Sequence, residues 1–193
     1  SFQFKLLDSG ALYRLYAYLS NMSFTPNEIA DQIRKNVNFV HGNKDLLIKY
    51  LDNDITDDLR SEIIAKTASE FSSRKEVRVA LFSIQRNFYD GSGLVADGRD
   101  MGTVVFNDAK LKVFLTASPE ERAKRRYLEL QNRGQEVNMR ELIDDIKERD
   151  FKDSSRELSP LFQAEEAHII DSSNLSLEEV ISITENLIKK EFM

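Results

Sequence analysis

Residues 93–98 read Gly93-Leu-Val-Ala-Asp97-Gly98, an apolar run that ends in an acidic turn. Three more apolar runs end in polar turns: Lys5-Leu-Leu-Asp8-Ser9-Gly10, Leu111-Lys-Val-Phe-Leu-Thr-Ala-Ser118 and His168-Ile-Ile-Asp171-Ser172. Such runs are typical of strands that are buried on both faces. Helical patterns separate them, so the sequence predicts an α/β protein with a mostly parallel sheet. Ligands of these sheets bind beyond the carboxyl ends of the strands, where these turns fall.

The composition is that of an ordinary globular protein. The 193 residues include 33 acidic and 27 basic side chains, which gives a net charge of −6 and argues against bulk binding to nucleic acid. The absence of cysteine excludes a disulfide scaffold and a thiol nucleophile. No apolar stretch approaches the ~20 residues of a membrane span. We therefore expect a cytoplasmic protein with neither a membrane nor a nucleic-acid partner.

Three predicted helices have an apolar face that should dock on the sheet. These faces are Leu12, Leu15, Tyr16 and Leu19; Val77, Leu81, Ile84 and Phe88; and Leu177, Val180, Ile183 and Leu187. Helix starts are marked by capping-box patterns at Thr25–Glu28, Ser118–Glu121 and Ser176–Glu179. Residues 37–60 read instead as a small antiparallel meander, with polar turns at Gly42-Asn43 and Asp52-Asn53-Asp54. Residues 120–156 read as two highly charged helices joined near Arg133-Gly134.

The densest candidate site is Asp97-Gly98-Arg99-Asp100-Met101-Gly102. An aspartate at a strand end can bind Mg²⁺ directly or through water, and arginine offers phosphate a planar fork. Glycine on both sides lets the backbone approach a ligand closely. On the local pattern alone, the alternative is a turn with a surface ion pair.

A second candidate is Leu7-Asp-Ser-Gly-Ala-Leu-Tyr-Arg14, where a strand end and a hydroxyl open a helix. A helix N-terminus favours anions, although simple N-capping by Asp8 or Ser9 explains the same pattern.

A third candidate lies among the basic residues of 120–156, most of which read as solvated helix surface with i,i+4 ion pairs. Arg149, Asp153 and Arg156 recur at near-helical spacing and should share one face. Two cations around a carboxylate suit a phosphorylated sugar, with arginine on the phosphate and aspartate on the ribose hydroxyls.

Several stretches, in order along the chain, closely resemble bacterial cytidylate kinases. The most specific is Val95-Ala-Asp-Gly-Arg-Asp-Met-Gly-Thr-Val-Val-Phe106. The others are Leu6-Leu-Asp-Ser-Gly-Ala-Leu-Tyr-Arg14, Phe114-Leu-Thr-Ala-Ser-Pro-Glu-Glu-Arg122, Asp145-Ile-Lys-Glu-Arg-Asp150, Ser159-Pro-Leu161 and Ile170-Asp-Ser-Ser173. The resemblance covers essentially the whole chain.

This resemblance implies a P-loop nucleoside-monophosphate-kinase fold: an α/β, parallel-sheet core with a small antiparallel insertion and a helical lid. Residues 1–193 would form a single kinase domain, with the monophosphate-binding insertion at about 33–72 and the lid with its flanking helices at about 120–156. The family transfers the γ-phosphoryl group of ATP to CMP or dCMP with Mg²⁺. We expect these nucleotides as partners and a monomeric protein.

The resemblance also implies a role for each matching residue. The CMP phosphate would be held by Ser9, Arg14, Arg99 and Arg156, the cytosine edge would be read by Ser69, Arg78 and Asp100, and the ribose would be held by Arg149 and Asp153. A carboxylate such as Asp100 can accept a hydrogen bond from the cytosine N4 amino group. Arg99 and Arg149 would act in catalysis together with Asp97, which is expected to orient Mg²⁺-bound water.

One part of the family pattern has no match. The family begins with a strand, a Gly-x-x-x-x-Gly-Lys-type phosphate loop and a helix, and no stretch of this sequence fits that loop. We expect that about 25 residues, on typical element lengths, are missing at the N-terminus. The 193 residues alone should then turn over ATP poorly. Two alternatives stay open: a monophosphate kinase of other base specificity, and a non-catalytic nucleotide-binding module.

Overall fold

A computed structural model describes residues 2, 4–41, 46–132 and 134–193. The chain folds as two compact units, Ser1–Met101 and Gly102–Met193. The predicted turn at Gly42-Asn43 and the predicted junction residue Arg133 lie outside the described residues.

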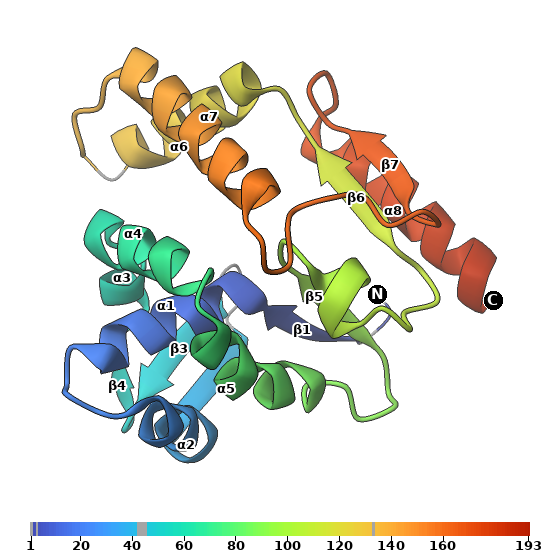
Figure 1. Cartoon of the computed structure of the whole chain (residues 1–193). Helices are drawn as coiled ribbons and strands as arrows, with labels where there is room; N and C mark the ends of the chain where they lie inside the picture. The colour runs from blue at the N-terminus through green and yellow to red at the C-terminus, as the bar shows by residue number, and fades with distance from the viewer. Residues whose placement is uncertain (1, 3, 42–45, 133) are drawn as a thin grey trace. The chain divides into compact units, whose positions relative to one another are not determined.

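The first unit combines one parallel strand pair, a small antiparallel sheet and several helices (Figure 1). Its elements are β1 (Lys5–Asp8), α1 (Ser9–Ser20), α2 (Pro26–Asn36), β2 (Val37–His41), β3 (Leu46–Tyr50), β4 (Asn53–Asp54), α3 (Thr56–Leu59), α4 (Glu62–Phe71), α5 (Lys75–Arg86) and β5 (Leu94–Asp97).

Strands β1 and β5 pair in parallel, with Asp8 opposite Asp97. The two predicted acidic strand ends therefore lie side by side, as expected for the carboxyl edge of a parallel sheet. Helix α1 begins directly after β1, and its predicted apolar face is buried at Leu12, Leu15 and Leu19. This helix packs against α2, α4 and α5 and forms the centre of the unit.

Strands β2, β3 and β4 pair in that order and form the predicted antiparallel meander, which is shorter than the predicted residues 37–60. Thr56 anchors its last turn: the Ile48 N–H donates to Thr56 Oγ1 at 2.9 Å, and Thr56 Oγ1 donates to Asp54 Oδ1 at 2.6 Å. The meander ends there, because residues 56–59 turn into helix α3.

The second unit contains another parallel pair and a pair of long helices. Its elements are η1 (Met101–Val105, shared with the first unit), β6 (Val113–Thr116), α6 (Pro119–Asn132), α7 (Met139–Ser155), β7 (His168–Asp171) and α8 (Leu177–Phe192). Strands β6 and β7 pair in parallel, with Thr116 opposite Asp171, and α6 packs against α7. The two predicted charged helices are thus confirmed. Within the described residues, no helix combines the length and the apolar character that crossing a membrane requires.

The predicted capping boxes form at Thr25–Glu28 and Ser176–Glu179, and Ser118 Oγ accepts from the Glu121 N–H at 3.2 Å. The four predicted strands are present, and both of their pairings are parallel. Within the described residues, these four strands form two separate two-stranded sheets rather than one continuous sheet.

The prediction that these strands are buried on both faces is wrong, because a two-stranded pair leaves strand surface uncovered. Val95, Leu115 and Ile169 are all exposed. Helix α8 likewise has no buried side chain, although its apolar face was predicted to dock on the sheet. Phe88 lies beyond the end of α5 and is half-buried, with its ring 5.4 Å from that of Phe39.

Candidate active site

The junction of β1 and α1 is built around the Asp8 carboxylate. Asp8 is the N-cap of α1: its Oδ1 accepts from the Ala11 N–H at 2.8 Å. The other oxygen pairs with Arg14 Nη2 at 3.1 Å. The capping alternative considered for this stretch is therefore correct for Asp8. The same carboxylate also holds Arg14, one of the predicted phosphate ligands, at the start of the helix.

Ser9, the next residue, is buried and contacts two other elements. Gln85 Nε2 on α5 donates to Ser9 Oγ at 2.8 Å. On another side, a Cβ added to Gly98 would lie 2.9 Å from Ser9 Cβ, closer than real Cβ contacts allow. Glycine at position 98 is thus needed for the end of β5 to approach Ser9.

Asp97 lies beside Asp8 at the ends of the paired strands. Its side chain reaches solvent, yet crowding by surrounding protein atoms raises the pKa of its carboxyl, and the negative charge of Asp8 raises it further. The positive charges of Arg99 and Arg14 act in the opposite direction. This strand edge therefore concentrates negative charge that the two arginines offset only in part.

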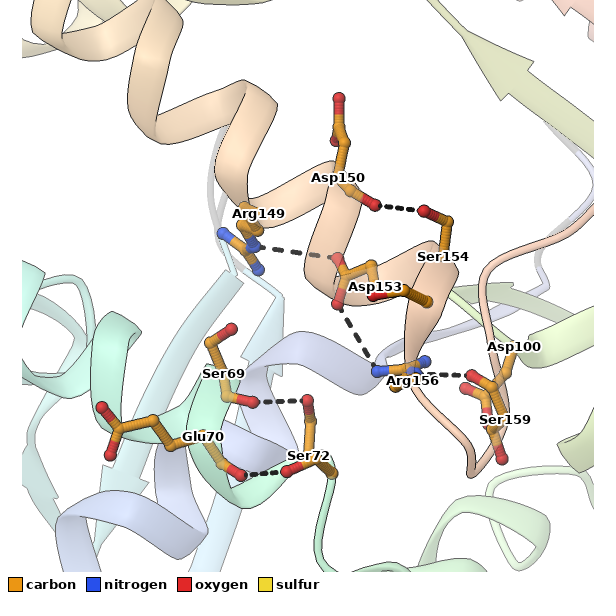
Figure 2. A network of polar contacts seen from close by, with 12 residues as sticks. Ser69, Glu70, Ser72, Asp100, Arg149, Asp150, Asp153, Ser154, Arg156 and Ser159 are labelled. Carbon is orange, nitrogen blue, oxygen red and sulfur yellow. Dashed lines mark hydrogen bonds and ion pairs between the residues drawn. The ribbon is translucent and has the colours of Figure 1, made fainter.

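Arg78 and Asp100 form a buried ion pair between Arg78 Nη2 and Asp100 Oδ2. Asp100 is 3% exposed, and the Arg78 side chain is 13% exposed. Arg78 also donates to the Ser72 carbonyl at 2.9 Å, and its guanidinium lies 5.9 Å from the ring centroid of Tyr13. Ser72 in turn donates through Oγ to the Ser69 carbonyl at 2.7 Å (Figure 2). The predicted base-reading residues Ser69, Arg78 and Asp100 are thus linked through Ser72.

In the second unit, Asp153 lies between two arginines at the end of α7 (Figure 2). Its carboxylate is 4.0 Å from Arg149 Nε and 3.5 Å from Arg156 Nη1. Arg156 also donates through Nε to the Ser159 carbonyl at 2.6 Å. The predicted shared face of these three residues is confirmed. Asp153 and Arg156 are buried there, whereas Arg149 reaches solvent.

A separate clasp holds α7 against α6. Arg122 donates to Asp150 through both Nη1 and Nη2, and its Nε donates to the Ala117 carbonyl at 3.1 Å. The hydrogen bonds to Asp150 raise the pKa of the Arg122 guanidinium. Asp150 directly follows Arg149, so this clasp fixes the part of α7 that carries the predicted ribose-binding residues.

No group of three or more metal-ligating side chains occurs within residues 2, 4–41, 46–132 and 134–193. The facing carboxylates of Asp8 and Asp97 are nevertheless oxygen donors of the type that Mg²⁺ prefers. Two carboxylates fit a hydrated Mg²⁺ that keeps most of its waters better than a fully protein-ligated one.

Some supporting residues were missed by the sequence analysis. The linking role of Ser72 had no distinctive pattern, because it depends on backbone oxygens. Gln85 did leave a trace, since it continues the buried face Val77-Leu81 at i+4 spacing and is polar where an apolar residue is expected.

Parallel strands that end in carboxylates, followed by a helix N-terminus and flanked by arginines, are typical of α/β proteins that bind phosphorylated ligands. A sequence model of the family described as cytidylate kinase matches residues 1–190. The chain belongs to the cytidylate kinase family. This confirms the resemblance predicted from the motifs and identifies the chain as a kinase, a phosphotransferase.

Curated relatives agree over most of the chain. The cytidylate kinase of Stutzerimonas stutzeri is 44% identical over 182 residues, 91% of this chain and 80% of the relative. That of Proteus mirabilis is 42% identical over 186 residues, 94% of this chain and 83% of the relative. Cytidylate kinase 1 of Haemophilus influenzae is 44% identical over 183 residues, 92% of this chain and 79% of the relative.

Proposed function

We propose that this chain transfers the γ-phosphoryl group of ATP to CMP and dCMP, forming the diphosphates and ADP. The single observation that carries the proposal is the family match over residues 1–190. The chemistry of the site residues also suits the base, the phosphate and the ribose of CMP.

The buried pair of Asp100 and Arg78 suits the cytosine edge. The Asp100 carboxylate would accept from the N4 amino group, while uracil offers a carbonyl oxygen at that position and would be repelled. A well-placed pair of this kind is worth about 1–3 kcal/mol of discrimination between bases. Arg78 already binds one Asp100 oxygen, so it orients that carboxylate. Ser69 is linked to this pair through Ser72, which donates to the Ser69 carbonyl and accepts from Arg78.

The phosphate of CMP would bind at the start of α1. Ser9 offers a hydroxyl and Arg14 a guanidinium that Asp8 holds in place. Arg99, at the end of β5, adds a second cation. These groups match the acceptor-only oxygens of a phosphate, and arginine can bind them with two parallel hydrogen bonds.

Asp153 and its two arginine partners, Arg149 and Arg156, would bind the ribose and the phosphate of CMP. Its carboxylate can accept from ribose hydroxyls, and Arg156 can bind the phosphate while Arg149 reaches the ribose. Asp153 is buried between its two arginines, which hold its carboxylate in a fixed orientation. Residues 33–72 and 120–156 are proposed to act as the monophosphate-binding insertion and the lid.

In the reaction, a CMP phosphate oxygen forms a bond to the γ-phosphorus as the bond to the β–γ bridging oxygen breaks. Such transfers depend on positioning and charge neutralisation more than on acid–base catalysis. Arg99 and Arg149 would neutralise the transferring charge. Mg²⁺, when bound, supplies further neutralisation of the ATP phosphates. Asp97 would hold its hydration water, with Asp8 as neighbour.

A coupled assay with ATP and CMP, dCMP or UMP tests the proposal. We expect CMP turnover to exceed UMP turnover by roughly tenfold or more in kcat/KM. Equal turnover of UMP would favour a kinase of other specificity. CMP binding without turnover would favour a non-catalytic module.

The role of Asp97 is tested by Asp97→Asn. This variant should need more Mg²⁺ for half-maximal turnover while its affinity for CMP, measured without ATP or Mg²⁺, stays the same. An active variant with an unchanged Mg²⁺ dependence would remove Asp97 from the proposal.

A further inference from the structure

We propose that Gln85 is a positioning residue that orients the Ser9 hydroxyl toward the CMP phosphate. The inference rests on the proposed function, because it takes Ser9 as a phosphate ligand. Gln85 itself does not touch the substrate in this proposal. Its amide donates to Ser9 Oγ and so determines where the Ser9 hydrogen can point.

The contact is a buried polar one between two elements of the first unit. Gln85 on α5 is 2% exposed and Ser9 on α1 is 3% exposed, and Gln85 Nε2 lies 2.8 Å from Ser9 Oγ. Burying an amide costs free energy unless it is hydrogen-bonded. Val77 and Leu81 precede Gln85 at i+4 spacing on the same face, so leucine or methionine would fill its position without that cost.

The direction of the hydrogen bond carries the argument. A serine hydroxyl has one hydrogen to donate and two lone pairs that accept. Gln85 occupies a lone pair of Ser9, so the one hydroxyl hydrogen remains available for another acceptor. Phosphate oxygens only accept hydrogen bonds, and bonds to charged groups are the stronger kind. With Gln85 in place, the Ser9 hydroxyl hydrogen is left for an acceptor such as a phosphate oxygen.

Two neighbours limit the other roles open to Ser9. Asp8 already caps the helix by accepting from the Ala11 N–H at 2.8 Å, so the Ser9 hydroxyl is not needed there. Gly98 approaches from the end of β5, and even an added Cβ would come within 2.9 Å of Ser9 Cβ. Ser9 is thus held between Gly98 and Gln85, with little freedom to move when a phosphate binds.

A double-mutant cycle tests this coupling. The affinities of the wild-type chain, Gln85→Met, Ser9→Ala and the double variant for CMP are measured by titration calorimetry without ATP. Cytidine serves as a ligand that lacks the phosphate. Methionine matches the length of glutamine and cannot donate a hydrogen bond. Gln32→Met is the matched control, because Gln32 accepts from Tyr50 and Asn36 rather than from a proposed ligand of CMP.

We expect Ser9→Ala to weaken CMP binding by roughly tenfold or more, the usual loss for a hydrogen bond to a charged group. Gln85→Met should weaken CMP binding by roughly threefold to tenfold and leave cytidine binding and the unfolding temperature nearly unchanged. In the Ser9→Ala background, Gln85→Met should add less than about a twofold loss, because coupled residues are not additive. Gln32→Met should bind CMP like the wild type.

The possible failures are distinguishable. An equal loss of CMP affinity in the wild-type and Ser9→Ala backgrounds would overturn the inference, because Gln85 would then act without Ser9. Unchanged CMP binding by Gln85→Met, or by Gln85→Leu where the methionine variant does not fold, would also overturn it while leaving the proposed function intact. A wild-type chain that does not bind CMP would overturn both.

Discussion

Replacing Arg78 by methionine tests whether the Arg78–Asp100 pair is a coupled unit. The substitution keeps much of the side-chain volume but leaves the buried Asp100 carboxylate without Arg78. Removing one partner of a buried ion pair typically costs about 3–5 kcal/mol. Asp100 is 3% exposed, so water cannot replace the lost guanidinium, and the Ser72 carbonyl and the Tyr13 ring lose a partner as well. We therefore expect a loss within this range.

The expected shift is measurable by thermal or urea unfolding. For a chain of this size, about 1 kcal/mol corresponds to roughly 2–4 °C, so Arg78→Met should lower the unfolding temperature by roughly 6–20 °C. The double variant Arg78→Met with Asp100→Asn removes the buried charge and should regain part of this loss. CMP affinity should stay low in both variants, because neither can present a charged Asp100 held by Arg78.

Two results would refute this reasoning. Arg78→Met could unfold within about 0.5 kcal/mol of the wild type, the range of ordinary surface substitutions. The pair would then contribute little. Alternatively, the double variant could be no more stable than Arg78→Met. The uncompensated carboxylate would then not be the cause, and the loss of packing around Arg78 would have to explain the effect. Asp100→Asn alone controls for changes at the aspartate.

Three further predictions concern other parts of the chain. Gly98→Ala would place a Cβ 2.9 Å from Ser9 Cβ and 3.0 Å from Met101 Cγ, so we expect a loss of about 1–3 kcal/mol in unfolding and weaker CMP binding; normal behaviour would contradict the close approach. The hydrogen bonds from Thr56 lower the pKa of Asp54, so the unfolded chain binds more protons between the lowered and the ordinary pKa. Stability from this group is present above the ordinary pKa and is lost as the pH falls, and Asp54→Asn should flatten the acid limb of an unfolding-against-pH curve. Arg122→Met should reduce amide-exchange protection in α7 more than in α8, because it releases the Asp150 clasp, and an even loss across both helices would argue against that role.

The strands and the apolar face of α1 could be predicted because their patterns are local. Leu12, Leu15 and Leu19 recur at helical spacing, and each is fully buried as expected. The acidic strand ends followed from where each apolar run stops. The burial of the strands could not be predicted in this way. An apolar run indicates that a strand is suited to burial. Whether the strand is buried depends on which elements pack on it, and Val95 and Leu115 are exposed.

The contacts that orient the candidate site residues were beyond sequence reasoning for a related reason. The Ser9–Gln85 bond joins residues 76 positions apart, and the Arg122–Asp150 clasp joins residues 28 positions apart. Such pairs meet only after α5 packs against α1, or α7 against α6. The Arg149–Asp153 spacing was predictable because both residues lie on one helix, where i and i+4 share a face.

Buried polar residues offer a way to find such contacts from the pattern of the core. Among the described residues of the first unit, the buried polar side chains are Ser9, Thr56, Gln85 and Asp100. Thr56 anchors the small sheet, and the other three belong to the proposed CMP site or to its support. A polar group inside a core is tolerated when it is hydrogen-bonded, so each of these side chains marks a place where a polar partner lies nearby. The polar residue that interrupts the apolar face of α5 is therefore the position from which a supporting residue of this site could have been inferred.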